Sequence, residues 1–217
     1  MGSVPIGQAV KNVLRRTRAY EMFEHSRRIR QLTRWEQAGR PVPPPHLYKQ
    51  GQLKRYAERF SLDVLVETGT CLGDMVYAVR DVFREIHSIE LNESFYRRAR
   101  RRLAGLPHVS LILGDSVRVL PGIVAALQRP CLFWLDAHYS GGATARGELE
   151  TPVAQELQCI LRDCRVRHVI LIDDAREFTG SRDYPTLGEA RALVLQRHLD
   201  WMVEVEHDII RIHERCN

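Results

Sequence analysis

The sequence has no long hydrophobic run. None of the apolar stretches in its 217 residues approaches the ~20 residues that a transmembrane helix needs. The N-terminal segment MGSVPIGQAVKN also lacks the apolar core of a secretory signal. We therefore expect a protein without a membrane span that is located in the cytoplasm.

Cysteine is scarce as well. The five cysteines are scattered and show no metal-binding spacing. An odd number of scattered cysteines argues against the disulfide framework of a small secreted domain. We expect free thiols in a reducing compartment, which agrees with a cytoplasmic location.

Acidic residues are few in the N-terminal part of the chain. Residues 1–60 contain 13 Lys and Arg against 4 Asp and Glu, so the net charge of +5 arises there and the remainder is acidic overall. Apolar positions at helical spacing, among them Val13, Phe23 and Trp35, predict one or two helices over residues 8–37. This arm can pack its apolar stripe on the following domain or on a second copy of the chain, giving a homodimer. Alternatively, its arginines dock an anionic acceptor, or contact a membrane surface or nucleic acid.

Proline is concentrated in one short segment, Gly39 to His46 (GRPVPPPH). Each proline fixes φ and disfavours helix in the residue before it, so the segment is predicted to be a stiff, extended joint. It separates a basic arm, residues 1–46, from a domain at residues 47–217 that begins with a helix. The total length suits one full hydrophobic core with an appendage.

From residue 63 the hydrophobic pattern alternates between short strands and helices. Strands are predicted at 63–67, 86–90, 109–113, 131–136 and 168–173, and helices at 73–84, 93–104, 116–128, 152–163 and 186–199. The strands are short apolar runs, as expected for parallel strands covered on both faces. Two strand-like segments at 201–205 and 209–212 predict a closing hairpin. The fold class is therefore predicted to be α/β, a Rossmann-like three-layer αβα sandwich whose mostly parallel sheet ends in an antiparallel hairpin.

Acidic residues end or follow all five predicted parallel strands. They are Glu67, Glu90, Asp115, Asp136 and the pair Asp173 and Asp174. Ligands of such sheets bind at the carboxyl ends of the strands, so we expect these side chains at one edge. A cap or turn explains any single one of them. Together, however, like charges repel unless cations or hydroxyl donors occupy the edge.

The turn after the first strand combines an acidic residue with glycines, in the order Glu67-Thr68-Gly69-Thr70-Cys71-Leu72-Gly73. Glycine permits φ > 0 and close approach of a ligand, and free N–H groups at the following helix start can hold an anionic group. Glu90 is placed to accept hydrogen bonds from both hydroxyls of a ribose. The G-x-G-x-x-G pattern of dinucleotide-binding turns is absent, which disfavours an NAD-dependent dehydrogenase.

The order ETGTCLG, SIEL, LGDS and WLDAHY, followed by a terminal hairpin, resembles class I S-adenosylmethionine (SAM)-dependent methyltransferases over residues 60–217. The turn departs from the frequent GxGxG of that family because the middle glycine is missing. The resemblance implies SAM-binding roles for Glu67, Thr68, Gly69, Thr70, Gly73, Glu90, Asp115, Ser116 and Asp136. Glu67 and the two glycines would flank the methionine part, Glu90 the ribose, and Asp115 with Ser116 the adenine.

Asp136 and the pair Asp173 and Asp174 are similar to the divalent-metal site of catechol-type and macrolide- or aminocoumarin-sugar O-methyltransferases. Hard oxygen ligands of this kind suit Mg²⁺. A bound metal lowers the pKa of a coordinated hydroxyl and positions it. The sequence leaves an alternative open, in which Asp174 caps the following segment and Asp173 hydrogen-bonds locally.

His138 lies two residues after Asp136 and is a candidate general base, because histidine titrates near neutrality. Alternatively, Asp136 is the base, or His138 only orients Asp136. The polar loop from Tyr139 to Glu148 contains three glycines and is predicted to be either a mobile lid or a plain surface loop. Within it, Tyr139 and Arg146 are candidate substrate contacts.

The expected function is therefore SAM-dependent O-methyl transfer, assisted by Mg²⁺, to a hydroxyl of a small molecule, natural product or glycan. An exocyclic-amine DNA methyltransferase is disfavoured because no Asp/Asn-Pro-Pro-Tyr/Phe follows the fourth strand. Two alternatives remain. One is an RNA or protein methyltransferase that docks its substrate through the basic arm, although we do not favour nucleic acid as a partner. The other is a non-enzymatic interaction domain.

Overall fold

The structure, a computed structural model, describes residues 18–137, 151–162 and 166–215. The chain divides between residues 49 and 50 into two units, which are described separately. None of the described helices is long and apolar enough to cross a membrane.

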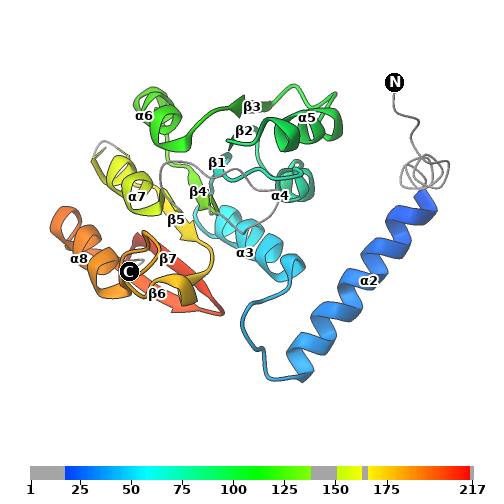
Figure 1. The fold of residues 1–217 in the computed structure, drawn as a ribbon, viewed down its shortest axis with the longest axis horizontal. Coiled ribbons are helices and arrows are strands. Elements are labelled where there is room, and N and C mark those ends of the chain that lie inside the picture. The colour runs from blue at the N-terminus through cyan, green and yellow to red at the C-terminus, as the bar shows by residue number, and fades with distance from the viewer. Residues whose placement is uncertain (1–17, 138–150, 163–165, 216–217) are drawn as a thin grey trace. The chain divides into compact units, whose positions relative to one another are not determined.

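Helices and strands alternate along the chain (Figure 1). The described helices are α2 (Arg18–Gln37), α3 (His46–Arg59), α4 (Asp74–Val79), α5 (Glu93–Arg102), α6 (Ser116–Ala126), α7 (Val153–Arg162), the 3₁₀ turn η1 (Ala175–Glu177) and α8 (Leu187–Arg197). The strands are β1 (Val64–Thr68), β2 (Glu85–Glu90), β3 (Val109–Leu113), β4 (Leu132–Leu135), β5 (Val169–Ile172), β6 (Trp201–Glu206) and β7 (Ile209–Glu214). All the strands predicted from the sequence are present, with ends shifted by one or two residues.

The first unit contains α2 and the beginning of α3. Where the chain leaves α2, the indole N–H of Trp35 donates a hydrogen bond to the carbonyl oxygen of Pro41 at 2.6 Å. The Trp35 ring also packs on Tyr48, with the ring centroids 4.8 Å apart. Met22 and Phe23 on α2 are exposed, so the apolar stripe predicted for the arm is only partly covered.

The second unit is organised around a seven-stranded sheet of order β3-β2-β1-β4-β5-β7-β6. Strands β1 to β5 are parallel, and β7 pairs antiparallel with both β5 and β6. This is the predicted doubly wound sheet with a closing hairpin. The strand order reverses between β1 and β4, and such a switch point is where open α/β sheets bind their ligands.

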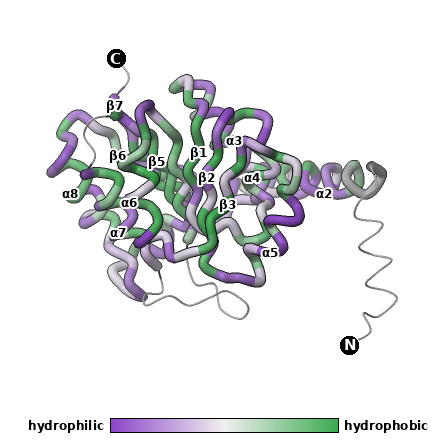
Figure 2. Tube along the Cα trace, turned by 90° about the horizontal axis from the view of Figure 1, so that it is seen from above, coloured by the Kyte–Doolittle hydropathy of each residue, from purple (hydrophilic) through white to green (hydrophobic). Residues whose placement is uncertain are grey.

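Helices cover both faces of the sheet. Figure 1 shows α3, α4 and α5 on one side and α6, α7 and α8 on the other. Every residue of β1, β4 and β5 is buried, and their side chains are apolar except for Glu67 and Thr68 at the end of β1. Figure 2 shows β1 and β5 as predominantly hydrophobic and α5 as predominantly hydrophilic. The three-layer sandwich expected from the sequence is therefore present.

One helix is shorter than predicted. The pattern suggested a helix over residues 73–84, but α4 ends at Val79. The chain then turns, and the N–H groups of Arg84 and Glu85 donate to the carbonyl oxygen of Asp63 at 2.8 and 3.2 Å. Phe83 is nevertheless buried, so the apolar pattern in the sequence continues past the end of α4.

Candidate active site

The turn after β1 lies directly against the end of β4. Gly69 has φ +85°, and a Cβ atom at this position would lie 2.4 Å from the carbonyl oxygen of Asp136. The neighbouring hydrogen bond from the Asp136 N–H to the Thr68 carbonyl, at 3.1 Å, holds the two strand ends together. Glycine is required at residue 69 both by its φ angle and by this close backbone contact.

The N–H groups of the turn at Gly69 to Cys71 are engaged, whereas the anion site was expected at the start of the helix that follows. The N–H groups of Gly69 and Thr70 donate to the carbonyl oxygen of Ile89 at 3.0 and 3.2 Å, and that of Cys71 donates to a Glu90 carboxylate oxygen at 2.6 Å. The turn therefore closes on the end of β2. Its amides serve the protein itself, because a buried N–H must find an acceptor.

Glu90, at the end of β2, holds this turn in place. One carboxylate oxygen accepts from the Cys71 N–H, and the other accepts from the Asn92 N–H at 2.8 Å. Burial raises the pKa of Glu90, against the effect of these backbone hydrogen bonds. Each oxygen has two lone pairs, so the carboxylate keeps acceptor capacity for hydroxyl donors.

The Glu67 carboxylate lies at one end of a buried chain of hydrogen bonds. The Ser88 hydroxyl donates to its carboxylate, and Ser88 in turn shares a hydrogen bond with the Thr70 hydroxyl at 2.5 Å. Burial, opposed by the Ser88 hydrogen bond and reinforced by the charges of Asp136 and Glu90, raises the pKa of Glu67 to about 8. Glu67 is therefore largely protonated at neutral pH, which removes one of the like charges expected at this edge.

A further buried carboxyl, Glu156, was not recognised from the sequence. It lies in the first turn of α7, and the Thr68 hydroxyl donates to it at 3.3 Å. Burial raises its pKa to about 7, although hydrogen bonds from Ser116 and Thr68 lower it. The available signal was its place on the apolar stripe of α7, between buried Val153 and Leu157.

These two raised pKa values predict a pH-dependent stability. Both groups ionise near pH 4.5 when unfolded but only near pH 8 (Glu67) and 7 (Glu156) in the folded chain. Their contribution is complete below pH 4.5 and is lost as pH rises through the folded values, by up to about 1.4 kcal/mol per pH unit for each group.

We therefore expect Glu67→Gln to lose less thermal stability than the wild type between pH 5 and pH 8. Thermal unfolding followed by circular dichroism across this range measures the difference. The exposed Glu58→Gln is the matched control and should follow the wild-type curve. Identical pH curves for Glu67→Gln and the wild type would contradict the assigned shift.

Asp115 and Ser116 begin α6 at the end of β3. The Asp115 carboxylate accepts from the Val117 N–H at 3.0 Å and so caps the helix. Ser116 is buried and hydrogen-bonds Glu156. The capping role allowed for Asp115 is thus present, and one carboxylate oxygen takes no part in the cap.

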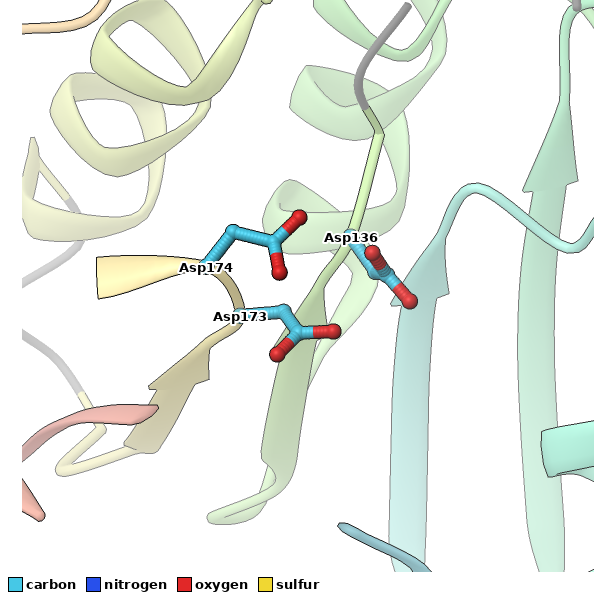
Figure 3. A group of neighbouring side chains, drawn as sticks. All are labelled: Asp136, Asp173 and Asp174. Atoms are coloured by element: carbon cyan, nitrogen blue, oxygen red, sulfur yellow. The ribbon is translucent and has the colours of Figure 1, made fainter. Parts of the chain in front are cut away.

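Asp136, Asp173 and Asp174 form a cluster at the ends of β4 and β5, hereafter the acidic cluster (Figure 3). One carboxylate oxygen from each residue lies within 4.8 Å of the other two. Asp173 and Asp174 are buried, and Asp136 is partly exposed. Three hard oxygen donors at this spacing fit Mg²⁺, which coordinates one or two carboxylates directly and keeps several waters.

Asp174 does not cap the segment that follows it. It precedes η1 with φ +56°, and its side chain makes no capping hydrogen bond. Instead, its Oδ1 accepts from the guanidinium of Arg176 at 2.8 Å. The local contact of Asp174 is therefore an ion pair with Arg176, and not the cap that the sequence left open.

A tyrosine, Tyr184, also interacts by charge with Asp174 of the acidic cluster. Burial and the charge of Asp174 raise the pKa of Tyr184, whereas a hydrogen bond with Thr151 lowers it. The Tyr184 ring packs edge-on against Phe178, with the centroids 5.4 Å apart. Tyr184 was missed in the sequence because it lies in the irregular segment between η1 and α8.

Three predicted site residues lie outside the described residues. They are His138, Tyr139 and Arg146, and the loop interpreted as a lid lies there with them. The described part of the chain brings together the other predicted residues at the carboxyl edge of the sheet: Glu67, Thr68, Gly69, Thr70, Gly73, Glu90, Asp115, Ser116, Asp136, Asp173 and Asp174. The hydroxyls of Thr68 and Thr70 are used in buried hydrogen bonds.

No family model and no curated protein matches the sequence. Among solved structures, the chain is similar to the O-methyltransferase TomG from Streptomyces achromogenes, involved in tomaymycin synthesis and solved with SAM (16% identity, 87% of this chain and 88% of that chain, TM-score 0.57). It is also similar to an O-methyltransferase from Bacillus cereus in complex with SAH (14% identity, 88% and 91%, TM-score 0.58). A third is the SAH-bound Podospora anserina methyltransferase PaMTH1 (19% identity, 100% and 100%, TM-score 0.56).

These similarities extend over most of each chain at low sequence identity, so they concern the fold. The strand order, the parallel sheet and the closing hairpin are the features expected from the resemblance in the sequence. The chain therefore has the fold of class I SAM-dependent methyltransferases.

Proposed function

We propose that the protein is a SAM-dependent O-methyltransferase. The observation that supports the proposal is that two groups of predicted site residues lie side by side at the switch point of the sheet. Glu90 and the Gly69 turn lie on β2 and β1, and the acidic cluster lies on the neighbouring β4 and β5. A nucleoside site beside a cluster of hard oxygen ligands suits metal-assisted transfer from a nucleoside cofactor.

The cofactor is proposed to run along the carboxyl edge from β3 to β4. Asp115 and Ser116 bind the adenine and Glu90 the ribose hydroxyls. The methionine part, with its sulfonium cation, lies near Gly69 and Asp136, together with Glu67, Thr68, Thr70 and Gly73. The sulfonium suits this edge because carboxylates stabilise a neighbouring cation.

An oxygen acceptor is supported by the acidic cluster and by the O-methyltransferases among similar structures. Asp136, Asp173 and Asp174 would hold Mg²⁺, whose chemistry is to lower the pKa of a hydroxyl and fix its position. His138, or Asp136 in its place, accepts the acceptor hydroxyl proton as the methyl group moves from sulfur to oxygen. Holding the two atoms in line supplies much of the rate.

The acceptor is proposed to be a hydroxyl of a small molecule, natural product or glycan, contacted by Tyr139 and Arg146. The test is transfer of labelled methyl from SAM to a panel of hydroxylated acceptors, with Mg²⁺ and with EDTA. We expect a Mg²⁺-dependent, base-stable methyl ether. Labelling of RNA or protein instead, with no small-molecule product, would contradict the acceptor class.

The basic arm supports one alternative acceptor class. Arg27, Arg30 and Arg34 are exposed on α2, which suits an RNA or protein substrate. Deleting residues 1–40 distinguishes the readings, because salt-sensitive RNA binding lost on deletion would favour the alternative. Sedimentation of the full chain and of the chain without residues 1–40 tests whether the N-terminal helices form the proposed homodimer.

Glu90→Gln is expected to weaken binding of S-adenosylhomocysteine (SAH) about 10- to 100-fold. The substitution replaces charge-assisted hydrogen bonds to the ribose by neutral ones, and each such bond contributes about 1.5–3 kcal/mol. Isothermal titration calorimetry measures the dissociation constant. Glu85→Gln, at the opposite end of β2, is the control and should bind SAH like the wild type. Equal affinity of Glu90→Gln and the wild type would place the ribose elsewhere.

A further inference from the structure

The tip of the β6–β7 hairpin is joined to the segment that carries the acidic cluster. The Ala175 N–H donates to the carbonyl oxygen of Asp208 at 2.9 Å, and the Arg176 N–H donates to the Asp208 carboxylate at 2.8 Å. Both donors follow Asp174 directly in sequence. Asp208 is buried, with φ +67°, so the hairpin turn presents its carboxylate to this segment rather than to solvent.

Arg176 connects this turn to the cluster itself. Its guanidinium donates to the Asp208 carboxylate and, at 2.8 Å, to Oδ1 of Asp174. One cation is therefore shared by two buried carboxylates. Figure 3 shows the Asp174 carboxylate on the side of its segment that faces Asp136. Two hydrogen bonds from backbone N–H groups already anchor the turn, one to the Asp208 carbonyl oxygen and one to its carboxylate. The guanidinium bridge adds a contact whose other end is a cluster residue.

The charges in this bridge have opposing effects on a bound cation. Arg176 orients Asp174, but its positive charge also repels a divalent ion at the cluster. The Asp208 carboxylate offsets that positive charge while it holds the guanidinium in place. Asp174 therefore keeps its orientation, while the repulsion between Arg176 and a bound cation is reduced.

We propose that Asp208 is a positioning residue for a divalent cation at the acidic cluster, acting through Arg176 on Asp174. The inference rests on the metal use included in the proposed function. It assigns to the closing hairpin a role in the site, because β6 and β7 supply the turn that sets the charge beside a metal ligand. Such outer partners of metal ligands commonly change metal affinity by 10- to 100-fold.

Asp208→Asn removes the negative charge of this side chain while keeping its size and shape. The amide oxygen of asparagine can still accept from the Arg176 N–H, but the negative charge is lost. Arg176 then keeps its ion pairs with Asp174 and, at 3.5 Å, with the partly exposed Glu177, but loses the buried charge that offsets its own, and we expect cation affinity to fall about tenfold. In the double variant Asp208→Asn with Arg176→Gln, both charges are removed, so affinity should recover most of this loss.

The experiment is calorimetric titration of the full chain with Mn²⁺ and with Mg²⁺. Glu204→Gln, an exposed carboxylate in the same hairpin, is the charge-matched control and should bind like the wild type. Thermal unfolding and SAH titration of each variant establish that the fold and the cofactor site are retained.

A loss in Asp208→Asn that recovers in the double variant supports the proposed role, in which Asp208 offsets the positive charge of Arg176 beside Asp174. Wild-type affinity in Asp208→Asn overturns it while leaving the metal proposal intact. Equal weakness of the single and double variants also overturns it, because the role of Asp208 would then be structural. Absence of saturable binding to the wild type overturns the metal proposal and this inference with it.

Discussion

Gly69→Ala is expected to lower the Tm by about 10 °C and to abolish measurable SAH binding. The new Cβ would lie 2.4 Å from the carbonyl oxygen and 2.8 Å from the carbonyl carbon of Asp136. Both are backbone atoms of the residue directly after β4, so relief requires the ends of β1 and β4 to separate where the cofactor site is proposed. Overpacking together with a positive φ costs about 3 kcal/mol or more, and a chain of this length loses about 2–4 °C per kcal/mol.

Gly105→Ala is the matched control for this prediction. Gly105 has φ +87°, close to that of Gly69, but its Cβ would meet nothing within 4 Å. It should therefore show only the conformational cost, about 1 kcal/mol, and bind SAH normally. Equal losses of Tm in the two variants would show that the contact with Asp136 does not contribute to the loss of stability.

Asp173→Asn is expected to weaken Mg²⁺ binding at least about 100-fold and to reduce methyl transfer in parallel. Asp173 is one of three cluster residues whose oxygens lie within 4.8 Å of one another. Replacing a charged ligand by a neutral isostere keeps the packing but removes a hard anionic donor, and outer partners alone change affinity by 10- to 100-fold. Calorimetry with Mg²⁺ and the labelled-methyl assay measure the two effects.

The design of this test separates metal binding from cofactor binding. SAH affinity should stay near the wild-type value, because the ribose and adenine contacts are proposed on β2 and β3. Asp81→Asn, which changes a largely exposed carboxylate two residues beyond the end of α4, should change neither affinity. Unchanged Mg²⁺ affinity in Asp173→Asn would remove the acidic cluster as the metal site.

The grouping of carboxylates at one edge of the sheet could be predicted, because it depends on short-range patterns in the sequence. Five apolar runs in alternation with helices indicate parallel strands, and parallel strands place their carboxyl ends at one edge. The residues that end those runs, such as Glu90 and Asp136, must then lie together. The hairpin was predictable for the same reason, because two strand-like runs flank a short polar turn.

The partners of these carboxylates could not be predicted in the same way. Asp208 lies 32 residues from Arg176, and Glu156 lies 88 residues from Thr68. Such pairs depend on how the hairpin and α7 pack in three dimensions, which no local pattern encodes. A buried Glu on an apolar helix face was a visible signal, but its partner was not.

The contacts of the turn after β1 could not be predicted either. Glycines and a following helix suggested N–H groups for an anion at the start of that helix. Within the turn itself, the strand register brings Ile89 and Glu90 close, and they accept its N–H groups. Glycine therefore marked close backbone packing at this position, because Gly69 lies against Asp136.

Thermal unfolding of the wild-type protein with increasing SAH tests the cofactor site most directly. A ligand at 100 times its dissociation constant stabilises the folded state by about 2.7 kcal/mol, which corresponds to a rise in Tm of about 5–10 °C for this length. We expect a saturable rise of that size, much smaller in Glu90→Gln at the same SAH concentration. An unchanged Tm at millimolar SAH would contradict the proposal that the protein is a SAM-dependent methyltransferase.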